Sequence, residues 1–176
     1  MSNHLYGFDI SMEQTGITIF DLRTLKPIHI TSVKTNEKHT HGMRLYTIAS
    51  VVEELKNTYE PKVVAIERGF SRFNTSTQVI YRAHGLVNYL MRDYEQNYYP
   101  PKQVKEAIVR GDATKKFVQD IIQVAYPDIV FNNEDESDSF AVALTYLIKN
   151  KLLEWDKKKY KEMLKPKRKM KSKKET

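Results

Sequence analysis

The sequence predicts an α/β protein with a five-stranded mixed sheet flanked by helices. Short segments rich in β-branched residues alternate apolar and polar side chains in a period of two, whereas longer segments repeat apolar residues every three or four positions. Three strand-like segments follow one another, and strands then alternate with helices. An opening antiparallel meander followed by alternating elements is typical of a layered α/β fold.

Five segments are predicted to be strands. Residues 16–21 (GITIFD) and 27–33 (PIHITSV) alternate as half-buried strands do, and residues 62–67 (KVVAIE) form a short apolar run typical of a strand buried on both faces. In chain order, the predicted strands are 4–10, 16–21, 27–33, 62–67 and 98–101.

Five segments have helical spacing. The segment 75–94 is distinctive because its apolar residues step by three and four along one seam, as in a coiled coil. Pro61 and the sequence Arg110-Gly111-Asp112 interrupt helices. The predicted helices are 41–59, 75–94, 102–109, 113–125 and 135–153.

Charge divides the chain into two parts. Eleven of the 29 Lys and Arg residues, but only two of the 22 Asp and Glu residues, lie in 157–176. The rest of the chain is slightly acidic. We therefore expect one folded domain over 1–156 and a basic, flexible C-terminal tail over 157–176, whose charge suits a polyanion such as a nucleic acid. A solubilising end without a partner is the alternative.

Composition excludes several classes of protein. The chain has no cysteine, which excludes disulfide scaffolds and Cys-ligated zinc sites and fits a reducing compartment. The longest apolar stretch, 140–148, is far shorter than the ~20 residues that span a bilayer. The N-terminus lacks the pattern of a signal peptide. We expect a cytoplasmic protein with no membrane contact.

Four carboxylates are candidates for a metal site. Asp9 interrupts an apolar strand, and Glu67 ends the most apolar strand. Asp135 and Asp138 are three positions apart at the start of the last predicted helix and so share a face. Because sites form at the carboxyl ends of parallel strands, these acids could converge. For Asp135 the alternative is a helix N-cap, and for Glu67 a solvent-facing strand end.

Clustered carboxylates repel one another, and divalent cations reverse that cost. Oxygen ligands without Cys or His suit Mg²⁺ or Mn²⁺. Two such ions can activate water and neutralise the leaving oxygen of a phosphodiester, so the cluster predicts metal-dependent hydrolysis. The histidines lack metal-site spacing, and we assign them no function.

Four segments resemble, in order, the motifs of RuvC-type Holliday junction resolvases, which have a ribonuclease H-like fold. They are GFDISMEQTGITIF, VVAIERGF, YPPKQVKEAIVRGDATKKFVQDII and EDESDSFAVALTYL, and together they span residues 5–147. Two departures are Ile-Ser-Met-Glu after Asp9, in place of Pro-Gly, and Arg68-Gly69 before the aromatic. This divergence resembles phage-encoded members, which would reside in the host cytoplasm.

The resemblance implies a homodimer, joined through 75–94, that makes paired nicks in Holliday junctions and other branched DNA using two Mg²⁺ or Mn²⁺ ions per active site. Asp9, Glu67, Asp135 and Asp138 would be metal ligands and catalytic residues. Phe70 would insert at the junction centre. Lys105 and Lys115 would contact the scissile phosphate region, with Lys115 also catalytic and Lys116 as its alternative.

The loop after the second acidic strand, RGFSRFNTSTQ, mixes basic and aromatic residues. We expect Arg68, Arg72 and Phe73 to contact DNA with Phe70, through phosphates and by stacking on bases. Either phenylalanine could instead begin the apolar face of the next helix. Three other functions remain open: a flap or branch endonuclease with relaxed junction specificity, a non-catalytic module that binds branched DNA, and a RuvC-like nuclease acting on ribosomal RNA precursor, against which Phe70 and this basic loop favour DNA junctions.

Overall fold

A five-stranded mixed sheet lies at the centre of the structure, a computed structural model that describes residues 2–69 and 74–164 (for 74–77 the backbone alone). The strand order is β3-β2-β1-β4-β5. The pairs β1–β2 and β2–β3 are antiparallel, whereas β1–β4 and β4–β5 are parallel. The strands are β1 His4–Asp9, β2 Gln14–Asp21, β3 Lys26–Lys34, β4 Pro61–Glu67 and β5 Glu95–Tyr99. The predicted five-stranded mixed sheet is confirmed.

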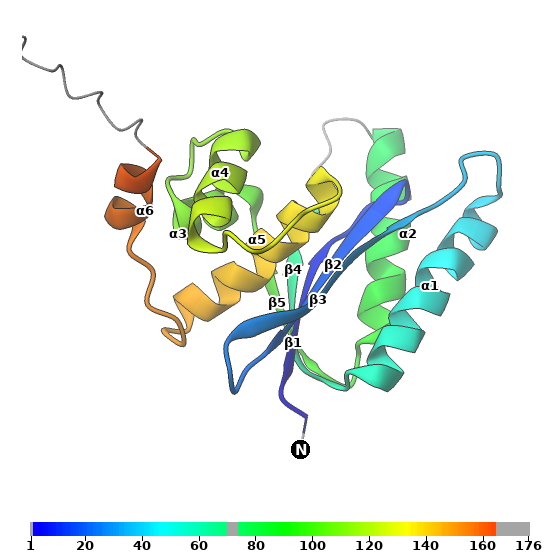
Figure 1. The fold of residues 1–176 in the computed structure, drawn as a ribbon. Helices are drawn as coiled ribbons and strands as arrows, with labels where there is room; N and C mark the ends of the chain where they lie inside the picture. The colour runs from blue at the N-terminus through cyan, green and yellow to red at the C-terminus, as the bar shows by residue number, and fades with distance from the viewer. Residues whose placement is uncertain (1, 70–73, 165–176) are drawn as a thin grey trace, which may run out of the picture.

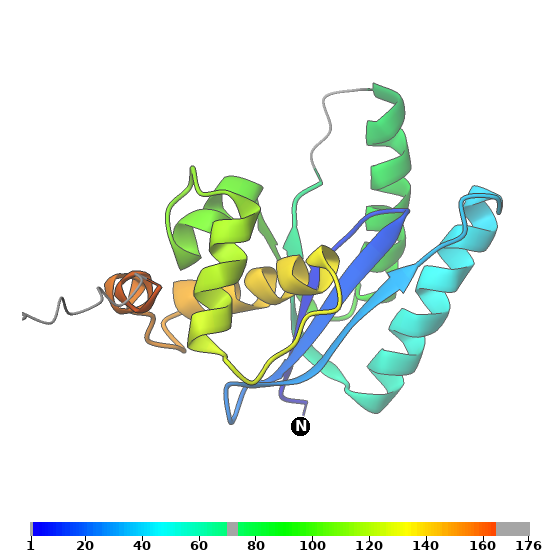
Figure 2. The same cartoon turned by 45° about the horizontal axis from the view of Figure 1, so that its top comes forward.

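Helices cover both faces of this sheet. Figures 1 and 2 show α1 and α2 on one face, and α5 across the other face with α3, α4 and α6 beside it. The helices are α1 His41–Thr58, α2 Asn74–Leu90, α3 Pro101–Ile108, α4 Lys115–Ala125, α5 Glu134–Lys149 and α6 Lys157–Met163. None of the helices in the described ranges is both long enough and apolar enough to cross a membrane.

Alternation along the strands creates two cores. On β1, Leu5 belongs to the core under α5, whereas Tyr6 and Phe8 belong to the core under α1 and α2. Because successive side chains point to opposite faces, Asp9 shares the α5 face with Leu5. On β4, Val63 and Ala65 lie in the α5 core, so Glu67 projects from that face too.

Two glycines let α5 approach the sheet closely. A Cβ built on Gly7 would lie 2.6 Å from the Ala143 Cβ, and one on Gly16 would lie 2.0 Å from the Asp135 carbonyl oxygen. Gly16 is also the register partner of Asp9. The N-terminal turn of α5 therefore rests directly on β2, beside the end of β1.

The apolar seam predicted over 75–94 faces the protein's own sheet. Ala83, Val87 and Leu90 of α2, with Met91 just beyond it, are buried in the core shared with α1. The seam is thus explained within one subunit and does not by itself indicate a dimer.

The C-terminal part departs from the expected pattern. The last long helix ends at Lys149 and not at 153, and residues 157–163, which we assigned to the flexible tail, form α6. Tyr160 and Leu164 pack against the α5 core, and the Trp155 ring lies 4.5 Å from that of Tyr160. The apolar residues that anchor α6 are too few to produce a helical period in a lysine-rich sequence.

Candidate active site

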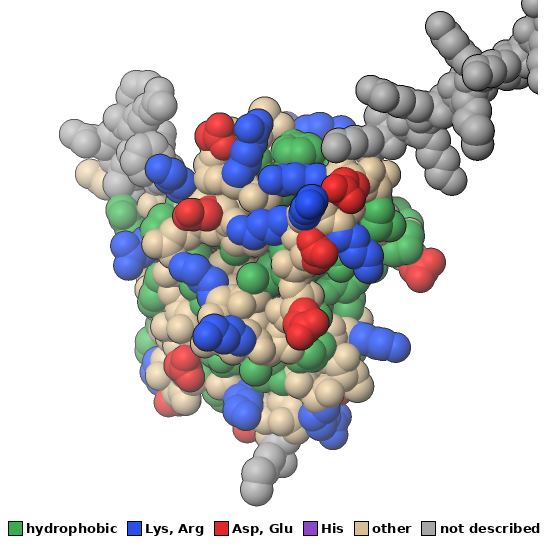
Figure 3. Space-filling view, turned by 90° about the vertical axis from the view of Figure 1, so that its left-hand side faces the viewer, with side chains coloured by type: hydrophobic (Ala, Val, Ile, Leu, Met, Phe, Trp, Pro, Cys, Tyr) green, Lys and Arg blue, Asp and Glu red, His purple; other side chains and the backbone are tan. Residues whose placement is uncertain are grey.

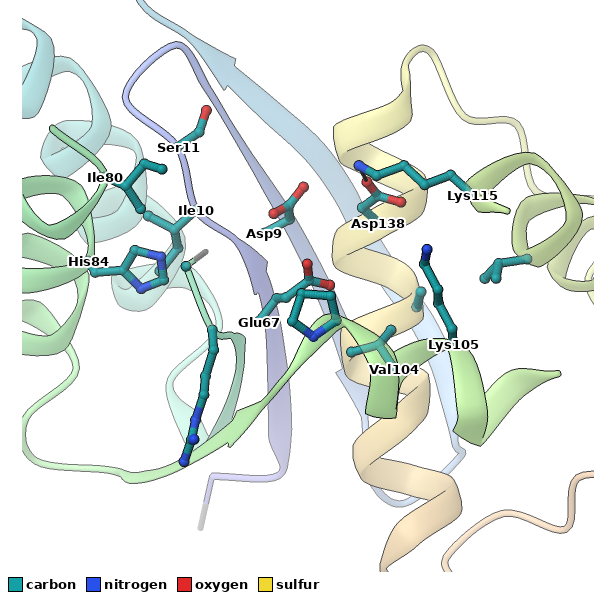
Figure 4. Close-up of a pocket in the computed structure, with 15 residues that line it drawn as sticks. Asp9, Ile10, Ser11, Glu67, Ile80, His84, Val104, Lys105, Lys115 and Asp138 are labelled. Atoms are coloured by element: carbon teal, nitrogen blue, oxygen red, sulfur yellow. Dashed lines mark hydrogen bonds and ion pairs between the residues drawn. The ribbon is translucent and has the colours of Figure 1, made fainter. Parts of the chain in front are cut away.

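Three of the four predicted carboxylates face one pocket. Asp9 ends β1, Glu67 ends β4, and Asp138 lies one turn into α5. All three line a cavity of about 290 Å³, and Figure 4 shows Asp9 and Glu67 at its centre with Asp138 facing them from α5. The parallel pairing of β1 with β4 brings the two strand ends together, and the close packing of α5 supplies the third acid.

Asp135 lies at the edge of this group. It does not line the cavity, but its charge acts on Asp9. It is not the helix N-cap, because the Asn133 side chain accepts a hydrogen bond from the Glu136 backbone N–H at 3.0 Å. The Glu136 carboxylate in turn accepts from the Asn132 N–H at 2.7 Å. Asn133 and Glu136 therefore cap α5, which leaves Asp135 and Asp138 outside the cap.

The pocket disfavours negative charge. Burial raises the pKa of Asp9 to about 7, and the charge of Asp138 adds to the effect. Burial also raises the pKa of Glu67 to about 8, with the charges of Asp9 and Asp138 contributing. The pKa of Asp135 is raised as well, mainly by burial. Protons or cations must neutralise such a group at neutral pH.

Two lysines reach the same pocket. The Lys115 ammonium donates to the Asp138 carboxylate and Lys105 lines the wall nearby (Figure 4). Burial opposes the charge on Lys115, but the hydrogen bond to Asp138 and the other acids outweigh it and raise its pKa. Lys116, the alternative to Lys115, instead pairs with Asp120 at 2.7 Å on the surface of α4.

Carboxylate oxygens are the donors that hard divalent cations prefer, and the pocket supplies them from three elements. In the present conformation, no three Asp, Glu or His side chains within 2–69 and 74–164 are grouped closely enough to hold an ion. Lys115 supplies the positive charge next to Asp138. The donor set fits a divalent cation, and the carboxylates would close around it.

The loop after β4 is described only in part. Arg68 is exposed, lines the pocket, and donates from its backbone N–H to the Tyr99 carbonyl at 2.9 Å. Phe70, Arg72 and Phe73 lie outside the described residues. Their predicted contacts with DNA therefore stay predictions.

One ionisable residue of the pocket was not predicted from the sequence. His84 of α2 lines the wall opposite Lys105 and Lys115 (Figure 4) and is 6% exposed. Burial lowers the pKa of His84. In the sequence, His84 is visible only as a polar residue within the apolar seam, between Ala83 and Val87. That seam was interpreted as a dimer contact, so His84 was not expected in the pocket.

Comparisons with known proteins agree on one family. The profile described as "Crossover junction endodeoxyribonuclease RuvC" matches residues 5–146. The RuvC endonuclease of Caldanaerobacter subterraneus is 31% identical over 158 residues, covering 84% of this chain and 94% of the relative. That of Alkaliphilus metalliredigens is 33% identical over 136 residues, covering 74% of this chain and 83% of the relative.

Solved structures support the same fold. Thermus thermophilus RuvC, in complex with a Holliday junction substrate, superimposes with a TM-score of 0.73 at 22% identity, over 85% of this chain and 95% of that one. The fowlpox virus Holliday junction resolvase gives a TM-score of 0.54 at 16% identity, over 85% of this chain and 99% of that one. With the matched profile spanning all four acidic positions, the chain belongs to the RuvC family of crossover junction endodeoxyribonucleases.

Proposed function

We propose that this protein resolves Holliday junctions by hydrolysing phosphodiesters with two Mg²⁺ or Mn²⁺ ions, and that it acts as a homodimer making paired nicks. One observation carries the proposal. Asp9, Glu67 and Asp138 come from three elements far apart in sequence and line a single cavity with Lys105 and Lys115. Family membership gives the class of reaction, and this cavity supports these residues as the place where it occurs.

Asp9, Glu67, Asp138 and, from the edge, Asp135 would hold the cations. The raised pKa values of Asp9 and Glu67 favour this role, because a cation removes the repulsion between the acids. When bound, divalent cations lower the pKa of a water nucleophile and stabilise the leaving oxygen.

Lys115 and Lys105 would hold the scissile phosphate. The Lys115 ammonium stays charged beside the acids and reaches the pocket from the N-terminus of α4, after Thr114 caps that helix. Lys105 reaches it from α3. A fixed ammonium near a transferring phosphoryl group stabilises the charge that develops there.

The surface beside the pocket would position duplex arms. Figure 3 shows Lys and Arg side chains spread over the side of the molecule that carries α3, α4 and α6. Exposed Lys102, Arg110, Lys116, Lys158 and Lys159 belong to this region. Contacts of this kind hold phosphates without reading bases, which suits an enzyme selective for DNA structure.

The outer face of α2 would join two subunits. Tyr81 and Tyr89 are 59% and 64% exposed, although both are large aromatic residues. Gly85 lies midway between them, and a Cβ built there would meet no atom within 4 Å. Residues four apart share a helix face, so the three form a strip with a shallow centre on which a second helix could pack.

Cleavage of a synthetic four-way junction tests the proposal. With Mg²⁺, the wild-type protein should make two symmetric nicks, and Glu67→Gln should reduce the rate at least 100-fold because it removes a charged ligand. Junction binding should persist in this variant. Glu53→Gln, at an exposed position of α1, is the matched control and should cut at the wild-type rate.

Four results would contradict the proposal. Wild-type cutting by Glu67→Gln would show that the active site is elsewhere. A single cut near a single-strand branch would indicate a flap nuclease. Junction binding without any cutting would indicate a non-catalytic module. Sedimentation of the free protein as a monomer, and of its complex as one subunit per junction, would contradict the dimer.

A further inference from the structure

A second cavity adjoins the carboxylate pocket. Its volume is about 320 Å³, and it is lined by Arg68, Gly69, Tyr81, His84, Asn88 and Tyr98. Arg68, Gly69 and His84 line both cavities. The two cavities therefore adjoin at these residues, and the second extends to Tyr98 on the edge strand β5. We call the second cavity the β5 groove.

His84 lies where the two cavities meet. Its Nε2 atom is buried and has no hydrogen-bond partner within the described part of the chain. Leaving such an atom unpaired destabilises the folded protein. Gly69 makes the position possible, since a Cβ built there would lie 2.8 Å from the His84 Nε2. The ring thus has an unused hydrogen-bonding atom against the backbone that follows Glu67.

The far wall of the β5 groove is polar and aromatic. The Tyr98 hydroxyl donates to Asn88 Oδ1 at 3.0 Å or to Gln96 Oε1 at 2.7 Å, which fixes the phenol ring over the groove. Tyr98 is 37% exposed. The Arg68 side chain adds a positive charge. Aromatic faces, amide groups and a guanidinium are the groups that bind an unstacked nucleotide.

We propose that the β5 groove binds the nucleotide next to the scissile phosphate, with the His84 Nε2 hydrogen-bonded to it. The proposal rests on the proposed function, because it needs a DNA strand across the carboxylate pocket. A strand whose phosphate lies between Asp9 and Lys115 would have its neighbouring nucleotide within reach of a cavity that shares a wall with that pocket. The nucleotide would supply the missing partner of Nε2, and its base would stack on Tyr98.

Single-turnover cleavage of junctions with one abasic nucleotide tests this proposal. The abasic site is placed in turn on each side of the scissile phosphate. For the wild type, we expect one of the two substitutions to slow cutting about tenfold, because a lost base removes stacking and a hydrogen bond. His84→Leu should cut the intact junction about tenfold more slowly and should lose most of its sensitivity to the abasic site.

Stability separates this role from a structural one. His84→Leu removes a buried unpaired atom, so its melting temperature should equal or exceed that of the wild type. His84→Gln keeps an N–H donor and should recover part of the rate. His39→Leu, in an exposed loop, is the matched control and should keep both the rate and the abasic sensitivity.

The possible failures are distinct. If the wild type cuts the intact junction but His84→Leu is as sensitive to the abasic site as the wild type, the β5 groove does not bind that nucleotide. The same conclusion follows if the rates of the His84 variants simply track their melting temperatures. If the wild type cuts no junction at all, the proposed function is wrong, and this inference fails with it.

Discussion

At the scale of single residues, the strand-end acids set the character of the site. Asp9 ends β1 in a half-buried position, and burial is the largest cause of the raised pKa of its carboxyl group. The negative charges of Asp138 and Asp135, both on α5, repel the Asp9 carboxylate and raise its pKa further. In the free protein this arrangement opposes folding at pH values where the acids are ionised, and a bound cation or a proton relieves it.

Asp9→Asn should therefore stabilise the metal-free protein at high pH. The folded-state pKa of Asp9 is raised from 3.8 to about 7, so the stability it contributes is complete below pH 3.8 and is lost as the pH rises through 7. Asparagine carries no charge and avoids this loss. In chelator at pH 8 we expect the variant to gain about 1–3 kcal/mol in the free energy of unfolding.

Urea unfolding at pH 5 and pH 8 checks this expectation. The advantage of the variant should shrink at pH 5, and saturating Mg²⁺ should favour the wild type, because the cation binds its folded state more strongly. Asp128→Asn, at an exposed position, should show no such pH dependence. An advantage of Asp9→Asn that is equal at both pH values would mean that the Asp9 pKa is not raised.

From the sequence, the strand-end acids of the site could be predicted, whereas the other residues around the site could not. An acid inside an apolar strand is costly without a partner, so Asp9 and Glu67 could be identified from their surroundings in sequence. Asp135 and Glu136 are adjacent acids with the same sequence neighbours, so the sequence does not show which of them caps the helix. The hydrogen bond from the Asn132 backbone N–H assigns Glu136 to the cap. His84 could not be identified, because a polar residue in a seam does not reveal which cavity it faces.

At the scale of elements, α5 decides whether the site forms. The Thr18 and Ser139 hydroxyls hydrogen-bond at 2.8 Å between β2 and α5. Asn133 donates to the Ser32 Oγ at 2.8 Å and ties the start of the helix to β3. These bonds and the contacts at Gly7 and Gly16 hold the N-terminal turn of α5 flat on the sheet, so Asp138 faces β1.

Gly16→Ala should displace that turn. The new Cβ would lie 2.0 Å from the Asp135 carbonyl oxygen, so the helix must move away from β2. We expect cleavage to fall at least tenfold, and the free energy of unfolding to fall by about 1–3 kcal/mol, as overpacking usually costs. Circular dichroism should remain that of a folded protein.

Gly42→Ala is the matched control for this change. Its nearest neighbour would be the Thr40 Oγ1 at 4.0 Å, so the added methyl group has room. Alanine at the start of α1 should leave cleavage unchanged and stability equal or slightly higher. Full activity in Gly16→Ala would show that the site tolerates a shift of α5.

Periodicity gave the order of the elements but not always their partners. The apolar seam of 75–94 predicted a helix, which the structure has as α2 over Asn74–Leu90. The same spacing allows the helix to pack on a second subunit or on its own sheet, and Ala83 and Val87 pack on the sheet. The strand predicted at 98–101 overlaps β5 only at 98–99, because β5 runs from Glu95 to Tyr99 and Pro101 already begins α3.

At the scale of the whole molecule, charge is concentrated beyond the family match. The RuvC profile ends at residue 146, whereas α6 and the basic segment after it lie beyond that limit. The segment 165–176 contains seven Lys or Arg residues and one Glu. Within the described residues, α6 is anchored on the α5 core and lies on the basic side of the molecule shown in Figure 3.

Truncation after residue 164 should weaken junction binding and make it less dependent on salt. Each phosphate contact that is lost lowers the slope of log affinity against log salt by about 0.9, so several lysines should have a measurable effect. The cleavage rate at saturating protein should not change. Binding titrations between about 50 and 200 mM salt measure the slope.

A full-length variant with glutamine at the seven basic positions of 165–176 is the control for chain length. It should behave like the truncated protein if charge is responsible. An unchanged salt slope in both variants would mean that the segment does not touch DNA and serves solubility alone.

The anchoring of α6 also gives the protein an internal optical probe. The chain contains one tryptophan, Trp155, whose indole N–H donates to the Ile108 carbonyl at 2.9 Å. Its ring stacks beside that of Tyr126 at 6.5 Å. Undocking of α6 would bring this indole into water and shift its fluorescence emission to longer wavelength. Attachment of the C-terminal helix can thus be followed in solution without a label, with and without DNA.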